Sequence, residues 1–463
     1  MKSVGFRDLA RLAGKLHLYR RMATTTIDPV SGASAAPVAG EQPGSYWQLL
    51  RNGGFTAFLW TQFLGAFNDN LYKITVSLLT VMLIADQQQT TNYLAAAGFL
   101  FVLPFVLFSG YAGQLADRYN KRGVLIFTKL LEIPAMLLGL WAFTANDPLW
   151  MLAVVFVLAL QATFFSPAKY GILPEMLPVR DMARANGLLE MTTFVAIILG
   201  TTVAGFLFEA WSAALWKISA VTIAIAVLGS LSSFGISRVR VPRVPEPFSW
   251  NPAREVWRGT SEMPRDRVLL LSITGISFFW FLGTLLQMDL LLFAKNTMRM
   301  SESGAGILIA GLAVGIAVGS LLAGRISGDH IEIGLVAPGC LGMGLSALAV
   351  VWAAPNFGLT LTALMFLGMF GGFFIVPLNA LLQHHPPEEE KGRALGTNNF
   401  FNGAAMLMAA VIFWVLTNRL EWSGAHVIFA AGCFTIASTL IVLWFTPEPT
   451  SRYLLTLLVR GIY

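Results

Sequence analysis

Two charged residues, Asp69 and Lys73, lie near the middle of an apolar run that extends from Phe55 to Ile84. The run is long enough to cross a bilayer as a helix. A charged side chain at that depth costs about 2.5 to 3.5 kcal/mol, so each residue needs a partner or a water-filled cavity. Their spacing of four residues places both side chains on one helix face. We therefore predict that Asp69 and Lys73, with the adjacent Asn70, bind a polar substrate group or act as gating charges; a structural ion pair is the alternative.

Charged residues recur in the apolar runs that follow. Lys129 and Glu132 occupy the third run, Lys169 the fourth and Glu190 the start of the fifth. A lysine can bind a phosphate as a point charge, and a carboxylate can accept hydrogen bonds from an ammonium group. These residues predict a substrate site that holds both signs of charge beside apolar walls. Snorkelling to the nearby membrane face, or bracing between helices, is the alternative for Lys129, Glu132 and Glu190.

A basic motif follows the second apolar run, at residues 113–122. Its glycine allows two helices to approach closely. Its acidic and basic side chains can form a charge network between helices that must break when the helices move. We therefore predict a gate here, and the alternative is a basic loop that merely sets topology. The predicted gating residues of this motif are Asp117, Arg118, Lys121 and Arg122.

Two further features bear on this prediction. A degenerate copy of the basic motif, Ala323-Gly324-Arg325, ends the eighth run and lacks the acid. Asp289 lies toward the outer end of the seventh run. Because a carboxylate in an apolar run marks a functional position, we predict that Asp289 gates the outer side or contacts substrate.

The composition indicates that these apolar runs are membrane-spanning segments. Of 463 residues, 56% are hydrophobic and 12% are charged, and the mean hydropathy is +0.67. This is more apolar side chain than a soluble core of this length needs. We predict an all-α polytopic membrane protein with twelve transmembrane helices in two six-helix halves. The predicted spans are residues 55–84, 93–116, 123–144, 149–173, 186–208, 214–236, 268–294, 303–327, 331–354, 359–383, 397–418 and 425–446.

The twelve runs divide at a central stretch rich in arginine and proline. Internal repetition supports this division. Residues 63–65 and 281–283 both read Phe-Leu-Gly, and the pattern Arg-Ala-x-Gly occurs at 184–187 and again at 393–396. Their shared order indicates two halves in parallel repeat. The predicted domains are a basic N-terminal segment and linker at 1–45, six-helix halves at 46–236 and 268–446, a central loop at 237–267, and an amphipathic tail at 447–463.

Lysine and arginine are concentrated in alternate loops. Such residues mark the cytoplasmic side of a membrane protein, so both termini and the central loop are predicted to be cytoplasmic. This distribution also accounts for the formal charge of +6, and no nucleic-acid partner is predicted.

The motif at 113–122 resembles the motif between helices 2 and 3 of the major facilitator superfamily. Residues 67–73, Phe-Asn-Asp-Asn-Leu-Tyr-Lys, and residues 164–175 resemble motifs of the bacterial lysophospholipid transporter family, including its versions fused to acyltransferase and acyl-ligase domains. The likeness covers about residues 46–446.

This resemblance implies the major facilitator fold and a location in the bacterial inner membrane. It implies flippase-like movement of lysophosphatidylethanolamine and related monoacyl phospholipids from the outer to the inner leaflet by alternating access. The lipid bilayer and the lysophospholipid are then the partners, together with an acyltransferase or acyl-ACP synthetase domain or protein that reacylates the product.

Other functions fit less well. A proton-coupled major facilitator exporter or importer of another amphipathic small molecule is the main alternative, although residues 199–205 lack the Gly-Pro motif of the exporters. Neither Gly-x-Ser-x-Gly nor His-Glu-x-x-His occurs, so we predict no enzyme; a membrane sensor that transports nothing is a further alternative. The adjacent His384 and His385 do not share a helix face, and no metal or cofactor is predicted.

The ends of the sequence carry two further expectations. The basic segment at 1–22 could lie on an anionic inner leaflet, or Met22 could be the natural start. The tail at 447–463 resembles the segment that leads into the acyltransferase of fused family members; an interfacial helix of a free-standing transporter is the alternative.

Overall fold

The computed structural model describes residues 44–84, 86–239, 248–300, 302–447 and 450–451. The basic segment at 1–43 and most of the tail at 447–463 lie outside the described residues, and so do the expectations placed on them. Within the described part of the chain every regular element is a helix, which confirms the all-α prediction.

The first half contains six long helices and three short elements. α2 (Tyr46–Arg51) precedes the first long helix, and α7 (Leu173–Met176) and η1 (Val179–Asp181) connect the fourth to the fifth. The long helices are α3 (Gly53–Leu83), α4 (Gln87–Arg118), α5 (Lys121–Ala145), α6 (Pro148–Gly171), α8 (Met182–Trp211) and α9 (Leu215–Phe234).

The second half also contains six long helices. A helix that the sequence analysis placed within a loop, α10 (Pro252–Glu262), precedes them and is followed by η2 (Met263–Arg265). The π-helical turn η3 (Phe293–Thr297) extends the first long helix, and η4 (Ile333–Leu335) precedes the third. The long helices are α11 (Arg267–Leu292), α12 (Glu302–Ser327), α13 (Val336–Ala353), α14 (Phe357–His384), α15 (Lys391–Asn418) and α16 (Gly424–Phe445).

Each long helix overlaps one predicted span. Eleven of the described helices are long and apolar enough to cross a membrane. α3 is the twelfth long helix, with 31 residues, and it falls outside that set because the polar residues between Asn68 and Lys73 interrupt its apolar sequence. The prediction of twelve membrane helices is confirmed, and its least apolar member carries the first predicted site.

Polar side chains determine where many of these helices begin. Each accepts a hydrogen bond from a main-chain N–H of the first turn, a group that has no partner inside the helix. α15 differs because its N-cap residue, Glu390, makes no such bond. The capping residues are Asn52 for α3, Asp86 for α4, Asn120 for α5, Asp147 for α6, Asp266 for α11 and Asn356 for α14.

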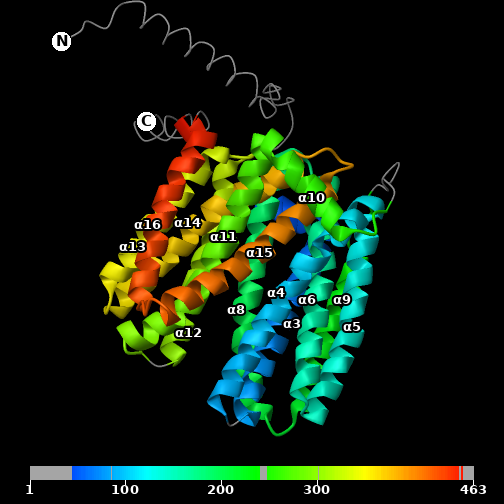
Figure 1. Cartoon of the computed structure of the whole chain (residues 1–463). Helices are drawn as coiled ribbons and strands as arrows, with labels where there is room; N and C mark the ends of the chain where they lie inside the picture. Colours follow the sequence, from blue (N-terminus) through cyan, green and yellow to red (C-terminus); the bar gives the residue numbers. More distant parts are fainter. Residues whose placement is uncertain (1–43, 85, 240–247, 301, 448–449, 452–463) are drawn as a thin grey trace, which may run out of the picture. The chain divides into compact units, whose positions relative to one another are not determined.

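The halves meet along two helix pairs, α4 with α15 and α8 with α12 (Figure 1). Glycines allow the main chains to touch. A Cβ at Gly113 would lie 2.5 Å from the carbonyl oxygen of Gly392, and one at Gly187 would lie 2.5 Å from that of Ser320. Any larger residue at Gly113 or Gly187 would therefore push the halves apart.

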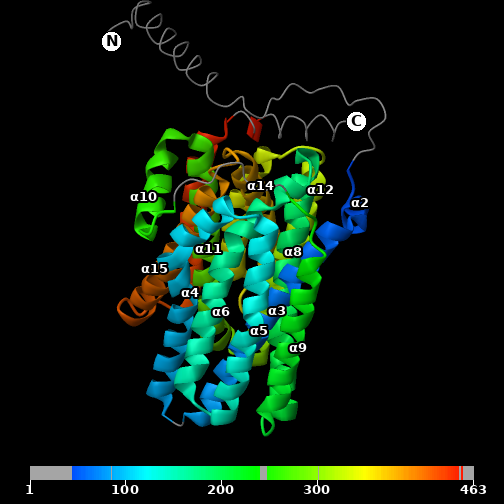
Figure 2. The same ribbon diagram turned by 90° about the vertical axis from the view of Figure 1, so that its right-hand side faces the viewer.

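These contacts lie toward one end of the helices, where α10 packs against both α4 and α15 (Figure 2). We call it the α10 end. An apolar cluster there contains residues of both halves, among them Leu173 and Leu189 of the first and Ala380 and Leu381 of the second. The halves are thus joined at the α10 end by packing as well as by polar contacts.

Candidate functional site

Lys129 and Glu132 of α5 form a buried ion pair. Asn68 of α3 donates a hydrogen bond from Nδ2 to Glu132 Oε1 at 2.7 Å. Lys129 also fills the space beside two glycines: a Cβ at Gly65 of α3 would lie 3.0 Å from Lys129 Nζ, and one at Gly229 of α9 would lie 3.1 Å from it. These groups all belong to the first half. In this conformation the pair braces α3, α5 and α9, and its role toward substrate stays a prediction.

Asp69 and Lys73 are half-buried on α3 and are not joined to each other by an ion pair in the described structure. The ammonium group of Lys73 lies 3.9 Å from the ring centroid of Phe101 on α4, a cation–π contact. Asp69 Oδ1 is buried and accepts no hydrogen bond from the described residues. Asn70 donates to the carbonyl oxygen of Ala66 at 2.7 Å. Asp69 and Lys73 therefore do not neutralise each other in this conformation.

Lys169 and Glu190 form a second charged group, which contacts both halves. Glu190 Oε1 of α8 accepts hydrogen bonds from Tyr170 Oη of α6 at 3.1 Å and from Asn379 Nδ2 of α14 at 3.0 Å. Lys169 Nζ lies 3.5 Å from Thr193 Oγ1 and 5.1 Å from the ring centroid of Tyr170. The arrangement places a cation and a carboxylate together where α6 and α8 meet α14.

Further polar bridges cross between the halves beside this group. Ser166 of α6 donates to Asn399 Oδ1 of α15 at 3.1 Å. Asn186 of α8 and Gln383 of α14 exchange two hydrogen bonds, of 3.0 and 2.7 Å. Because the side-chain amides of Asn186 and Gln383 donate to and accept from each other, they join the halves through neutral hydrogen bonds.

Asp117 of α4 caps a helix of the other half. Its carboxylate accepts hydrogen bonds from the main-chain N–H groups of Gly392 at 2.5 Å and Arg393 at 2.8 Å. These two groups lie in the first turn of α15, which has no side-chain cap from Glu390. A carboxylate at a helix N-terminus also interacts favourably with the helix dipole. The acid of the predicted gate thus bonds across the halves.

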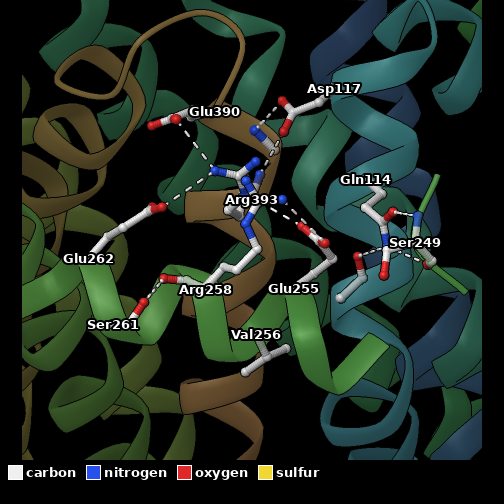
Figure 3. Close-up of polar contacts among 12 residues, drawn as sticks. Gln114, Asp117, Ser249, Glu255, Val256, Arg258, Ser261, Glu262, Glu390 and Arg393 are labelled. Atoms are coloured by element: carbon white, nitrogen blue, oxygen red, sulfur yellow. Dashed lines mark hydrogen bonds and ion pairs between the residues drawn. The ribbon is translucent and has the colours of Figure 1, made fainter. Parts of the chain in front are cut away.

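Arg393 connects the same helix end to α10 (Figure 3). The guanidinium is buried and lies 3.5 Å from Glu255, 3.6 Å from Glu262 and 3.4 Å from Glu390. Glu255 and Glu262 belong to α10, so an ion-pair network ties α10 to α15.

The start of the α10 region is fastened to α4. Gln114 of α4 accepts from the main-chain N–H of Ser249 at 2.7 Å and donates to the Ser249 carbonyl at 3.1 Å (Figure 3). A Cβ at Gly110 would lie 2.3 Å from the carbonyl oxygen of Pro252. α10 therefore clamps α4 of one half to α15 of the other.

A related contact joins α8 to α12. Arg184, the repeat counterpart of Arg393, forms an ion pair with Asp329 at 2.9 Å. Asp329 follows Gly324 by five residues, whereas Asp117 follows Gly113 by four, so an acid lies just beyond the degenerate copy of the motif. Tyr46 donates from Oη to the carbonyl of Leu321 at 2.5 Å, and burial raises the pKa of Tyr46 to about 12. Tyr46 thus remains a neutral donor at physiological pH.

His330, next to Asp329, provides a pH test of this region. Its Nε2 lies 3.1 Å from Glu332 Oε2, and this hydrogen bond raises the pKa of His330 above 6.5. Since the folded-state pKa is raised, the stabilisation is complete below the unfolded pKa and is lost as pH rises through the folded pKa. An NMR titration of the His330 ring should show the raised pKa, and Glu332→Gln should lower it, while the distant Glu209→Gln should not. An unchanged pKa in Glu332→Gln would contradict the pairing.

Two of the other predicted gating residues bond within their own half. Lys121 forms an ion pair of 2.5 Å with Glu175, and Arg122 donates to the main-chain carbonyls of Phe234, the last residue of α9, and Ile236, at 2.7 Å each. Arg118 ends α4 and is half-buried. Asp289 is fully buried on α11, and neither carboxylate oxygen accepts a hydrogen bond from the described residues, so its role at an outer gate or toward substrate stays a prediction.

Two parts of this arrangement were missed by the sequence analysis, although each leaves a signal. Asn251 followed by Pro252 is a typical helix start, with a capping side chain and a proline at the first helical position. Tyr170 lies in the motif at 164–175 and is related to Asn379 by the offset of 209 residues. The repeat thus relates two of the residues that bond to Glu190.

Comparison with known proteins agrees with this architecture. The family model described as Major Facilitator Superfamily matches residues 58–410, with a further match at 290–457. The solved structure of the human organic anion transporter MFSD10 superposes with a TM-score of 0.69 at 13% identity, covering 84% of this chain and 99% of that one. A bacterial homologue of the iron transporter ferroportin superposes with a TM-score of 0.67 at 15% identity, covering 86% and 99%. At these identities the likeness shows the fold alone.

Relatives found by sequence have a higher identity to this chain than these solved structures have. The lysophospholipid transporter LplT of Serratia proteamaculans is 30% identical over 78% of this chain and 87% of its own length. The LplT of Photorhabdus laumondii is 32% identical over 78% of this chain and 88% of its own length. The prediction of family from the motifs at 67–73 and 164–175 is confirmed. The chain belongs to the Major Facilitator Superfamily, in the branch of the relatives named lysophospholipid transporter LplT.

Proposed function

We propose that this protein carries lysophospholipids, chiefly lysophosphatidylethanolamine, from the outer to the inner leaflet of a bacterial inner membrane by alternating access. The observation that carries the proposal is the Lys169–Glu190 group between the halves. Such a lipid presents an anionic phosphate and a cationic amine, which match a lysine and a carboxylate held together. The names of the relatives support the same substrate.

The α10 end is proposed to face the cytoplasm. The basic residues of the motif at 113–122 and of the α10 region lie there, and such residues favour the cytoplasmic side. With this orientation the described conformation is closed to the cytoplasm. Both chain ends would then be cytoplasmic, as the sequence analysis expects.

The transport cycle would break the contacts at the α10 end. Asp117 would release the first turn of α15, Arg393 would separate from α10, and the Arg184–Asp329 pair would open. Because these bonds form in one conformation and not in the other, they set the balance between the two. Lys121 and Arg122 would act indirectly, by holding the α4–α5 connection in place.

The protein is proposed to be a carrier and not an enzyme. A lysophospholipid delivered to the inner leaflet is a monoacyl species, and an acyltransferase or acyl-ACP synthetase that reacylates it would prevent its return. The proposed partner is therefore an enzyme of that class, encoded separately or in the same chain.

A second candidate is proton-coupled transport of another amphipathic molecule, which Asp289 favours. It is a fully buried carboxylate without a hydrogen-bond partner among the described residues. Proton uptake would remove a buried charge that nothing compensates. Coupling by this residue predicts a transport rate that depends on a proton gradient.

Leaflet-resolved uptake into proteoliposomes tests both candidates. Labelled lysophosphatidylethanolamine is added outside, and its arrival in the inner leaflet is measured with and without a protonophore. We expect uptake above that of protein-free vesicles and insensitive to the protonophore. Uptake that collapses with the protonophore would favour proton coupling, and no uptake of any lysophospholipid would reject the proposed function.

The charges of α3 provide a variant test in the same assay. We expect Asp69→Asn and Lys73→Met each to reduce transport at least 10-fold, because each loses about 1.5 kcal/mol or more of charge-assisted binding, while folded protein falls less. The exposed Lys295→Met is the matched control and should transport normally. If both α3 variants are misfolded, these charges are structural; a charge swap that restores transport would favour pairing over substrate contact.

A further inference from the structure

A long apolar groove lies on the outside of the first half. It forms a cavity of about 800 Å³ bounded by α4, α5 and α6. Figure 2 shows α6 between α4 and α5, and α6 packs against both, whereas α4 and α5 barely touch. Leu115 and Tyr119 at the end of α4 line only one end of the groove, and the rest of it lies between α5 and α6. Phe127 and Leu131 line the groove and remain 62% and 42% exposed.

The groove has one polar end and a long apolar shaft. Tyr119 and Asn120 line the end nearest the α4–α5 connection. The shaft continues along α5 from Gly123 to Leu138, roughly 22 Å at about 1.5 Å per residue. Its polar lining groups along the shaft are already bonded: Gln161 donates to the carbonyl oxygen of Thr128 at 3.1 Å. A ligand that fits is therefore apolar for most of its length, and the phenol of Tyr119 can meet a polar group at one end.

Depth in the membrane indicates what the polar end of that ligand is. The phenol of Tyr119 is half exposed, and tyrosine commonly lies at the level of lipid headgroups. Lys121 and Arg122 follow directly in sequence, but Lys121 is paired with Glu175 and Arg122 donates to main-chain carbonyls at the end of α9, and neither residue lines the groove. With the orientation proposed above, this end lies at the cytoplasmic surface of the membrane. A lipid headgroup at that level lies beside Tyr119 while the acyl chain enters the shaft.

The groove is separate from the charged group between the halves. Phe164 of α6 faces the groove, whereas Ser166 and Lys169 of the same helix bond or pack on the other side, Ser166 to the second half and Lys169 beside Tyr170. α6 thus lies between the two places. A molecule in the groove contacts the bilayer directly and does not lie on a path between the halves.

We propose that this groove binds an acyl chain of a diacyl phospholipid from the inner leaflet, with the headgroup beside Tyr119. The volume is within the range of about 300 to 1,000 Å³ that is usual for ligand sites. The bound lipid is a structural component and not the transported molecule. It supports the connection that carries Asp117 on one side and Lys121 on the other.

Photocrosslinking tests the proposal on the full chain in lipid nanodiscs. The probe is a phosphatidylethanolamine with a diazirine on one acyl chain, and crosslinked peptides are identified by mass spectrometry. We expect crosslinks concentrated in residues 124–138 and 157–164. Leu131→Trp, which fills the shaft, should reduce them at least fivefold. Leu228→Trp, at a position 55% exposed on α9 and outside the groove, should leave them unchanged.

Three outcomes would overturn the proposal. Crosslinks spread evenly over the membrane helices would show no site, and equal crosslinking in Leu131→Trp and the unmodified chain would show that the shaft is not used. If Leu131→Trp does not fold, a competition on the unmodified chain decides. Excess dioleoyl phosphatidylethanolamine should displace the probe, and displacement by lysophosphatidylethanolamine at equal concentration would assign the groove to cargo. None of these measurements requires transport, so they are independent of the proposed function.

Discussion

Asp117→Ala is expected to open the α10 end of the protein. The substitution leaves the main-chain N–H groups of Gly392 and Arg393 without their acceptor and removes a carboxylate from the N-terminus of α15. The loss of about 2 kcal/mol from the closed conformation would raise the open-to-closed ratio about 30-fold. Cysteine probes placed near this end should then react faster, or spin-label distances across α4 and α15 should lengthen.

Asp147→Ala is the matched control. Asp147 caps α6 in the same way, with its carboxylate accepting from the main-chain N–H of Leu149 at 2.9 Å, but both groups belong to the first half. Its loss should lower stability without changing the balance between conformations. Equal probe reactivity in Asp117→Ala and the unmodified protein would remove Asp117 from the gate.

Lys169→Met is expected to reduce lysophospholipid transport about 10-fold or more. A charge-assisted hydrogen bond to phosphate contributes about 1.5 to 3 kcal/mol, which corresponds to about 10- to 150-fold in affinity. Glu190→Gln should act differently, because the amide keeps an oxygen that can accept from Tyr170 and Asn379. It should reduce transport of lysophosphatidylethanolamine more than that of lysophosphatidylglycerol, which has no amine.

Competition assays with the two headgroups measure this difference, with Lys295→Met as the control for loss of a lysine. The Tyr170→Phe variant distinguishes positioning from direct binding, since it removes one donor to Glu190 and leaves every charge in place. A Glu190→Gln protein that transports both lipids with unchanged preference would exclude Glu190 from headgroup selection.

The sequence predicted the membrane helices because a long apolar run has few other stable structures in a bilayer. The sequence did not predict which charged side chains of these helices would form ion pairs. Lys129 and Glu132 are three residues apart and Asp69 and Lys73 are four apart, so both sets share a helix face in an apolar run, yet the first two are paired and the second two are not. A run of residues shows that a charge is inside the membrane; the neighbouring helices, which belong to distant parts of the sequence, determine what it meets.

The same limit explains the parts of the gate that were missed. α10 is too short and too polar to appear as a span, and its role depends on Glu255 and Glu262 reaching Arg393, more than 130 residues later. Asp329 lies one residue beyond the position that Asp117 occupies in the first copy of the motif, so a comparison by fixed spacing overlooks it. Both features became evident from contacts between the halves.

The bonds of Asp117 have a consequence for comparing relatives of this protein. Asp117 recognises main-chain N–H groups, which every residue except proline supplies. The side chain at position 393 can therefore change without altering what Asp117 binds, and position 392 is restricted by space, since a Cβ there would lie 2.3 Å from the carbonyl oxygen of Gly113. A search for pairs of positions that vary together would assign Asp117 no partner, although it joins the two halves.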